Sequence, residues 1–126
     1  MNKVEKKYRE YFNNVFCIEV FEYIFNPFQA LKNINLLLKQ GGILYISFHT
    51  WYGLHKPEGE DYLRYTKYGI EKLLKETGFE IVEMLPKTVN QEARGALQEF
   101  YNDEGMRILY NDATFNEGYL VKAKKI

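Results

Sequence analysis

The stretch VFCIEVFEYIFNPFQALKNINLLLKQGG, from Val15 to Gly42, decides the fold. It contains an apolar strand, an acidic turn, a helical segment and a Gly-Gly exit, and a second apolar strand, ILYISF, follows at once. Asn26 predicts the N-cap of the helix and Pro27 its first residue, while Gly41 suits the left-handed position after the last turn. The stretch therefore predicts one βαβ unit, whose first strand is apolar enough to be covered on both faces.

Three further elements follow from hydrophobic spacing later in the chain. Thr66 predicts the cap of a second helix that ends at Gly78. A strand is expected from Phe79 to Leu85, and another from Tyr119 to Ala123. With the βαβ unit, these elements predict an α/β fold built on a sheet of about four strands.

Two segments lie outside this predicted sheet. Residues 3–12 have their apolar side chains on one side of a short charged helix, which we expect to pack as a lid. Residues 88–116 form an insertion, either facing a substrate or partner or simply covering the sheet; apolar spacing from Ala93 to Tyr101 predicts a helix in it that ends near Gly105. No linker is apparent, so residues 1–126 are expected to form a single domain, and the charged segment directly after Met1 favours a genuine start.

Composition limits the classes of protein to which the chain can belong. Seventeen basic residues balance seventeen acidic ones, so no net charge attracts nucleic acid or an anionic membrane. Cys17 is the single cysteine and lies in an apolar run, which excludes an intramolecular disulfide and indicates a small buried side chain in a reducing compartment. No stretch approaches a signal peptide or the roughly 20 apolar residues of a membrane span. We therefore expect a soluble, cytoplasmic protein.

Several motifs follow one another in a recognisable order: the turn IEVFEYI, the helix exit LLKQGG, the element LRYT and the strand start GFE. Together they resemble the vLEHv-like turn, the LKPGG-like exit and the R-aromatic-T element in the C-terminal half of a class I S-adenosylmethionine-dependent methyltransferase. The resemblance runs from Val15 to about Leu85 and resumes at Tyr119. It implies a truncated Rossmann-like sheet in which the strand at Val15 lies beside that at Ile43, followed by an antiparallel strand at Tyr119 and then Phe79 at the far edge.

The Gly-rich loop with which this family binds its cofactor is not in the sequence. None of the nine glycines has G-x-G spacing between a strand and a helix, the arrangement that lets backbone N–H groups approach the cofactor. Asn14, Tyr23 and Gln40 also replace the family's aspartate, histidine and proline, which bears on catalysis and not on the fold. Because methyl transfer requires donor and acceptor to be held in line, the resemblance implies a protein that is inactive or weak alone and uses S-adenosylmethionine only when the other half is supplied.

Polar and aromatic side chains follow the ends of the two predicted parallel strands, where ligands bind in open α/β sheets. The residues that the resemblance points to there are catalytic His49 and Tyr23, cofactor-binding Glu19 and Glu22, and substrate-binding Tyr52, His55 and Arg64. Two histidines and scattered carboxylates show no metal-ligand spacing, so the sequence predicts no metal.

Other interpretations of these residues stay open. His49 is either a general base or a loop histidine bonded to the backbone. The glutamates either face a ligand or belong to a solvated turn. Arg64 either clamps a carboxylate or phosphate, or pairs with Glu60 or Asp61 at the surface.

The predicted order of strands leaves the strand at Val15 at the edge of the sheet, with unpaired backbone groups that something should cover. A homodimer would do so, with the aromatic side chains Tyr8, Tyr11, Phe12, Phe16 and Phe21 in its interface. Three functions therefore compete: a methyltransferase-like protein of little activity, a homodimeric interaction module, and one half of a split enzyme completed by another chain. A small-molecule methyl acceptor is one option, and the sequence does not name it.

Overall fold

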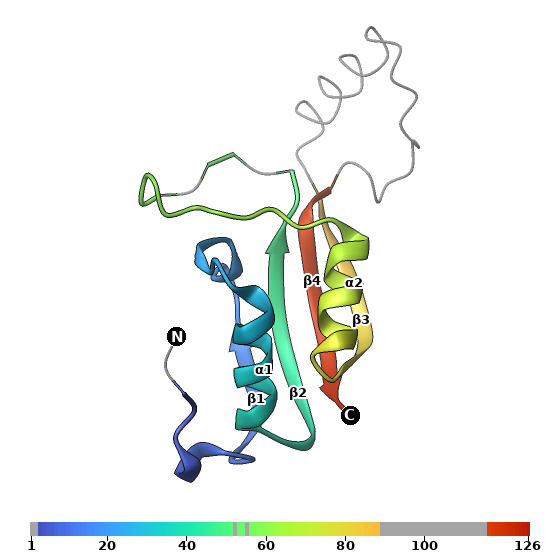
Figure 1. Cartoon of the computed structure of the whole chain (residues 1–126). Helices are drawn as coiled ribbons and strands as arrows, with labels where there is room; N and C mark the ends of the chain where they lie inside the picture. The colour runs from blue at the N-terminus through green and yellow to red at the C-terminus, as the bar shows by residue number, and fades with distance from the viewer. Residues whose placement is uncertain (1–2, 52, 55, 89–115) are drawn as a thin grey trace, which may run out of the picture.

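The computed structural model describes residues 3–51, 53–54, 56–88 and 116–126, which form a mixed α/β fold (Figure 1). Its elements are η1 (Lys6–Tyr8), β1 (Phe12–Cys17), η2 (Phe21–Tyr23), α1 (Pro27–Leu37), β2 (Leu38–His49), α2 (Lys67–Glu76), β3 (Phe79–Thr88) and β4 (Asn116–Lys125). The described strands make one sheet in the order β1-β2-β4-β3. This order confirms the one expected from the sequence.

The direction of the strands fixes one end of the sheet as the place where loops meet. β1 and β2 are parallel, with Val15 opposite Leu44, whereas β4 is antiparallel to both of its neighbours, β2 and β3. Because β1 and β2 run the same way, their carboxyl ends lie side by side. Gly118 in β4 allows close packing here, since a Cβ on it would collide with the carbonyl oxygen of Phe48 in β2.

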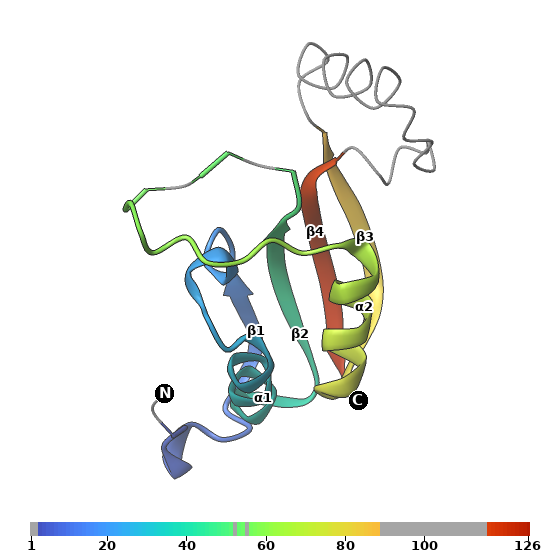
Figure 2. The same ribbon diagram turned by 45° about the horizontal axis from the view of Figure 1, so that its top comes forward.

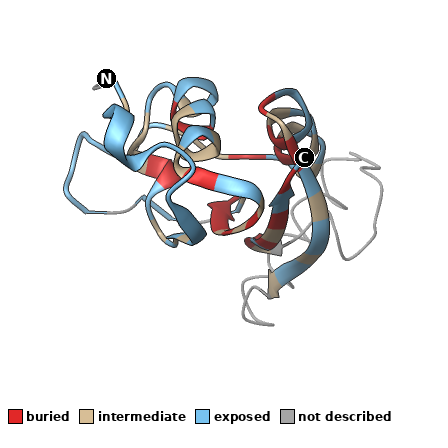
Figure 3. Cartoon of the chain, turned by 90° about the horizontal axis from the view of Figure 1, so that it is seen from below, coloured by how far each residue is buried: buried red, intermediate tan, exposed pale blue. Residues whose placement is uncertain are grey.

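Both helices, α1 and α2, lie on the same face of the sheet (Figures 1 and 3). The buried hydrophobic residues are Phe21, Ala30, Leu31, Leu38, Leu44, Ile46, Phe48, Tyr65, Ile70, Leu74, Phe79, Tyr119, Val121 and Ala123. Within this core the ring of Phe48 packs edge to face against Phe21 at 5.5 Å and against Tyr65 at 4.9 Å. The opposite face of the sheet carries no helix in the described parts of the chain.

Helix α1 begins where the sequence predicts and ends earlier. The side chain of Asn26 accepts a hydrogen bond from the Gln29 N–H at 3.1 Å, which confirms the N-cap. The helix then stops because Leu38 is extended, buried and paired with Phe12 of β1, so that β2 starts directly after α1. Gly41 is left-handed, with φ +74°, yet it lies inside β2 and not at the end of the helix. Tertiary pairing has therefore displaced the expected C-cap.

Helix α2 follows the sequence prediction at both ends. The Thr66 side chain accepts a hydrogen bond from the Gly69 N–H at 3.1 Å, and Gly78 is left-handed, with φ +87°. The carbonyl of Gly78 accepts hydrogen bonds from the Asn35 side chain at 3.0 Å and from the Ile126 N–H at 3.1 Å. The end of α2 is thereby attached to α1 and to the chain after β4.

The helix predicted over residues 3–12 does not form. A single 3-10 turn, η1, is followed by extended chain, and the Glu10 N–H donates to the carbonyl of Leu36 at 2.8 Å. This segment is thus held by the end of α1, and no strand pairs with the outer edge of β1 among the described residues. The inserted helix expected to end near Gly105 lies outside the described residues.

Two expectations about apolar side chains are also wrong. Phe16 in β1 is 71% exposed, so this strand is not covered on both faces, because the described helices pack against only one of them. Phe21, which was expected in a dimer interface, is fully buried in the core. Neither α1 nor α2, the helices that the structure describes, has the length and apolar character required to cross a membrane.

The segment between β2 and α2 passes over the carboxyl ends of β1 and β2 (Figure 2). Two backbone hydrogen bonds hold the part of this segment that leads into α2. The Tyr65 N–H donates to the carbonyl of His49 at 2.7 Å, and the Tyr62 N–H donates to the carbonyl of Glu22 at 2.9 Å. The Tyr65 hydroxyl also donates to the carbonyl of Phe21 at 3.1 Å. These bonds join the loops at this end of the sheet to one another.

We expect Phe48→Ala to lower the free energy of unfolding by about 3–5 kcal/mol, because it removes a fully buried ring that contacts two other core rings. Tyr68→Ala on α2 is the matched control: its ring is 77% exposed, and the change should stay within about 0.5 kcal/mol. Urea unfolding followed by circular dichroism measures both. Equal losses for the two variants would contradict the location of the core.

Candidate active site

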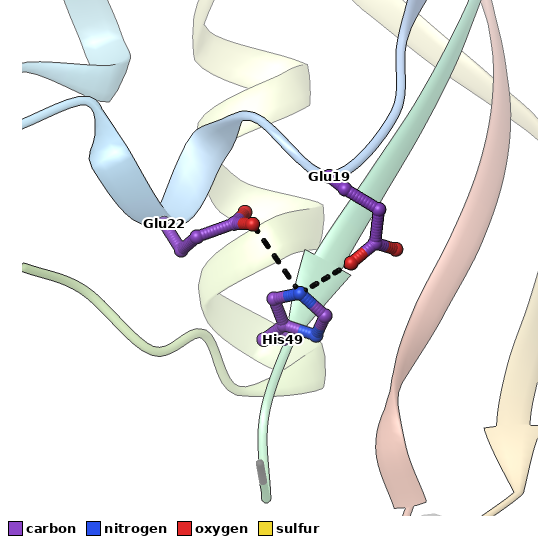
Figure 4. Close-up of side chains that lie close together, drawn as sticks. All are labelled: Glu19, Glu22 and His49. Carbon is purple, nitrogen blue, oxygen red and sulfur yellow. Dashed lines mark ion pairs between the residues drawn. The ribbon is translucent and has the colours of Figure 1, made fainter. Parts of the chain in front are cut away.

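A histidine and two glutamates meet where β1 and β2 end (Figure 4). His49 is the last residue of β2, whereas Glu19 and Glu22 belong to the turn after β1, with Glu22 inside η2. The Nε2 atom of His49 lies 2.6 Å from Oε2 of Glu19 and 3.4 Å from Oε1 of Glu22. The structure therefore brings together three of the seven residues that the sequence singled out. We call them the Glu19–Glu22–His49 cluster.

Glu19 is held by contacts on both its backbone and its side chain. Its backbone is left-handed, with φ +56°, a conformation uncommon for a residue with a Cβ. Its N–H donates to Oγ of Ser47 at 2.7 Å, and that hydroxyl donates in turn to Oε1 of Glu19 at 3.3 Å. The ammonium of Lys87 donates to the same Oε1 at 2.6 Å. Oε1 is thus occupied by Ser47 and Lys87, while Oε2 faces His49.

Glu22 is almost completely buried, at 1% exposure, so the interpretation as a solvated turn is wrong for this residue. Among the described residues neither oxygen of its carboxylate accepts a hydrogen bond, and its ion pair is with His49. Burying a carboxylate is costly unless a partner or a bound cation compensates it. The charge balance of this cluster therefore depends on His49 or on a bound group.

The environment also shifts the pKa values of neighbouring groups. Burial acts to raise the pKa of Glu19, but the hydrogen bond from Lys87, the charges of His49 and Lys87, and the hydrogen bond from Ser47 together lower it. Glu19 is therefore a carboxylate at neutral pH. Burial, followed by the charge of Glu22, raises the pKa of Cys17 to about 11, so its thiol stays protonated.

Arg64 and Tyr23 bind the loop above the strand ends. Arg64 donates to both carboxylate oxygens of Asp61, at 2.5 and 2.6 Å, and to the carbonyl of Gly53 at 2.9 Å. The pairing with Asp61 is as expected, but it does not lie at the surface, since the Asp61 side chain is only 3% exposed. The hydrogen bond to Asp61 raises the pKa of Arg64. The Tyr23 hydroxyl donates to the carbonyl of Lys56 at 2.6 Å, and partial burial, followed by the charge of Glu22, raises its pKa.

The remaining predicted residues, Tyr52 and His55, lie outside the described residues. The catalytic, cofactor-binding and substrate-binding roles assigned from the sequence stay predictions. Sequence analysis missed Ser47 and Lys87. Ser47 had a weak signal as a polar residue within an apolar strand, whereas Lys87 had none, because it is 68 residues from the glutamate that it contacts.

The sheet face opposite α1 and α2 is hollowed, with a volume of about 480 Å³. We call it the bare face; it is lined by Phe16, Ile18, Tyr45, Ile46, Glu83, Leu85, Leu120, Val121 and Lys122. The ring of Phe16 stacks on that of Tyr45 at 4.8 Å, nearly parallel at 8°. Leu85 and Leu120 are 50% and 42% exposed. All four described strands therefore contribute to a mainly apolar surface that no other described element covers.

No protein-family model and no curated protein sequence matches this chain. Solved structures do match its fold. An S-adenosylmethionine-dependent methyltransferase from Mesorhizobium loti matches with a TM-score of 0.63 and 12% identity, over 93% of this chain and 64% of that one. A putative S-adenosylmethionine-dependent methyltransferase from Listeria monocytogenes matches with a TM-score of 0.62 and 17% identity, over 99% of this chain and 65% of that one.

The [4+2]-cyclase SpnF has the same fold, with a TM-score of 0.58 and 18% identity over 93% of this chain and 50% of that one. The chain thus has the Rossmann-like fold of S-adenosylmethionine-dependent methyltransferases, as the sequence motifs predicted, and spans 50% to 65% of these neighbours. Because a cyclase shares this fold, the fold alone does not fix the reaction.

We expect His49→Leu to lower the free energy of unfolding by roughly 3–5 kcal/mol in chelator-treated buffer, because it leaves the carboxylate of Glu22 buried without its charge partner. Adding Glu22→Met to the same chain should recover most of that loss. Urea unfolding of the wild type, both single variants and the double variant gives the coupling energy. Additive losses would show that the two side chains do not interact.

Proposed function

We propose that this chain is the C-terminal half of an S-adenosylmethionine-dependent methyl-transfer domain, active only when a second segment supplies the Gly-rich cofactor loop. The observation that carries this proposal is the bare face. It lies opposite α1 and α2, and Phe16, Leu85 and Leu120 are all at least 42% exposed there. Parallel strands such as β1 and β2 are usually covered on both faces, and a large exposed apolar surface commonly marks an interaction site.

The lengths of the structural neighbours suggest what covers this face. The match leaves 36% of the Mesorhizobium loti methyltransferase without a counterpart, since 64% of that chain is covered. The outer edge of β1 has no strand paired to it among the described residues. A segment like the unmatched part of that methyltransferase could therefore extend the sheet beyond β1. We therefore identify the occupant of the bare face as the missing half of the domain, whether it is carried by this polypeptide or by another.

The Glu19–Glu22–His49 cluster would then form one wall of the ligand cleft. It lies outside the carboxyl ends of β1 and β2, where open α/β sheets bind ligands. Transfer of a methyl group from a sulfonium is an in-line displacement that depends on holding donor and acceptor at close range. His49 would act on the acceptor, either by taking its proton or by holding a cation that binds it, and Tyr23, Arg64 and the adjacent loop would shape the acceptor side.

We expect the chain alone to give no binding heat with S-adenosylmethionine or S-adenosylhomocysteine in isothermal titration calorimetry, because it has no Gly-rich loop to bind the cofactor's amino acid and ribose parts. Circular dichroism on the same sample checks that it is folded. Binding at micromolar affinity would contradict the need for a second segment.

A chimera tests the proposal in the opposite direction. We expect a fusion of the uncovered N-terminal part of the Mesorhizobium loti methyltransferase to this chain to bind S-adenosylhomocysteine. Leu120→Glu, which places a charge on the bare face, should abolish that binding, whereas Tyr68→Glu on the outer surface of α2 should not.

A homodimer that covers the bare face, a different surface from the β1 edge of the dimer expected from the sequence, makes a different prediction for the same two variants. Sedimentation equilibrium of the chain alone would then show a dimer that Leu120→Glu dissociates and Tyr68→Glu leaves intact, together with a chimera that binds no cofactor. That combination would assign the bare face to a second copy of the chain and would overturn the proposal.

A further inference from the structure

We propose that the Glu19–Glu22–His49 cluster binds a divalent metal ion of the Mn²⁺ or Zn²⁺ type. The three side chains each offer one ligand atom, and these atoms all lie within 4.8 Å of one another. Two carboxylate oxygens and one imidazole nitrogen are a donor set suited to these cations. The inference is opposite to the sequence-based expectation of no metal.

The two distances to His49 are close to those that a shared metal would require. Ligand atoms about 2.1 Å from one cation are roughly 3 to 3.5 Å apart in tetrahedral or octahedral geometry. His49 Nε2 and Glu22 Oε1 already lie at 3.4 Å. His49 Nε2 and Glu19 Oε2, at 2.6 Å, would need to separate by less than about 1 Å. A change of χ angles in the partly exposed Glu19 side chain can provide this.

The burial of Glu22 is the independent observation that points to a bound cation. Its side chain is fully buried and directed at His49, as Figure 4 shows, and neither of its oxygens accepts a hydrogen bond within the described ranges. A carboxylate in this state is expensive to keep unless a cation neutralises it. An apolar side chain at this position would not carry that cost.

The surroundings of Glu19 match those of a metal ligand. Lys87 and Ser47 both bind Oε1, which orients the carboxylate and leaves Oε2 facing the centre of the cluster. In metal sites, hydrogen bonds to the oxygen or nitrogen that does not bind the metal commonly orient the ligating side chain. The side chain of Glu19 is also 37% exposed, whereas those of His49 and Glu22 are at most 1% exposed, so a cation could enter beside it.

Three protein ligands leave at least one coordination position open, as in catalytic metal sites. That position lies at the carboxyl ends of β1 and β2, where a ligand of the proposed methyl-transfer site would lie. If that function holds, the cation would select acceptors with an oxygen ligand such as a hydroxyl or carboxylate, and would lower the pKa of a bound hydroxyl. Only this last step depends on the proposed function.

Mn²⁺ titration of the purified full chain, followed by the loss of the free Mn²⁺ signal in electron paramagnetic resonance, tests the site. We expect one Mn²⁺ per chain, displaced by Zn²⁺. Glu22→Gln and His49→Asn should each weaken binding at least about tenfold, the scale of losses seen even when groups behind the ligands are removed. Glu76→Gln, in an exposed pair with Lys72 on α2, should leave the affinity unchanged.

A second readout covers the case in which the His49 variant does not fold. Mn²⁺ should raise the thermal unfolding temperature of the wild type and of Glu76→Gln, but not that of Glu22→Gln. No Mn²⁺ or Zn²⁺ binding at millimolar concentration would overturn the inference and leave a proton on His49 as the compensating charge. Binding that is unchanged by Glu22→Gln would also overturn it, by placing the ion elsewhere. None of these measurements uses S-adenosylmethionine, so their failure is distinct from failure of the methyl-transfer proposal.

Discussion

The parallel pairing of β1 with β2 determines what meets at the candidate site. Two parallel neighbours present their carboxyl ends at the same edge, so the turn after β1 and the last residue of β2 have to lie together. Glu19 and Glu22 come from the former and His49 from the latter. The crossover through α1 lets β1 and β2 run parallel, and β2 begins directly after α1 at Leu38.

The sheet is asymmetric in its cover. On one face α1 and α2 bury a continuous core that includes Phe48 and Leu44, and on the other Phe16 and Leu120 remain accessible. Removing apolar surface from water is the main favourable term in folding. A sheet whose described helices cover one face therefore leaves the apolar surface of its other face available for burial. The chain spans 50% to 65% of the structural neighbours that share this sheet.

The two carboxylates of the site also lie in different electrostatic surroundings. Glu19 has an ammonium, a hydroxyl and an imidazole around it, and the balance of these lowers its pKa despite partial burial. Glu22 is more deeply buried; its ion pair is with His49, and its carboxylate accepts no hydrogen bond from the described residues. Both carboxylates face the imidazole of His49, but only that of Glu19 accepts hydrogen bonds from other described side chains. Such unequal environments are common at functional sites, because a group kept at a cost to stability is usually kept for its chemistry.

The sequence by itself determined the βαβ unit, the caps at Asn26 and Thr66 and the α/β class, because these depend on local spacing and on backbone bonds within a few residues. Through its motifs it also determined the order of the strands. Tertiary structure alone decided that Glu10 and Tyr11 bond to the end of α1, that Gly41 lies inside a strand, and that Glu22 is buried. It also placed Lys87 on Glu19, 68 residues away. The physical reason is that burial and charge pairing join residues far apart in the chain, and no local pattern encodes which of them will meet.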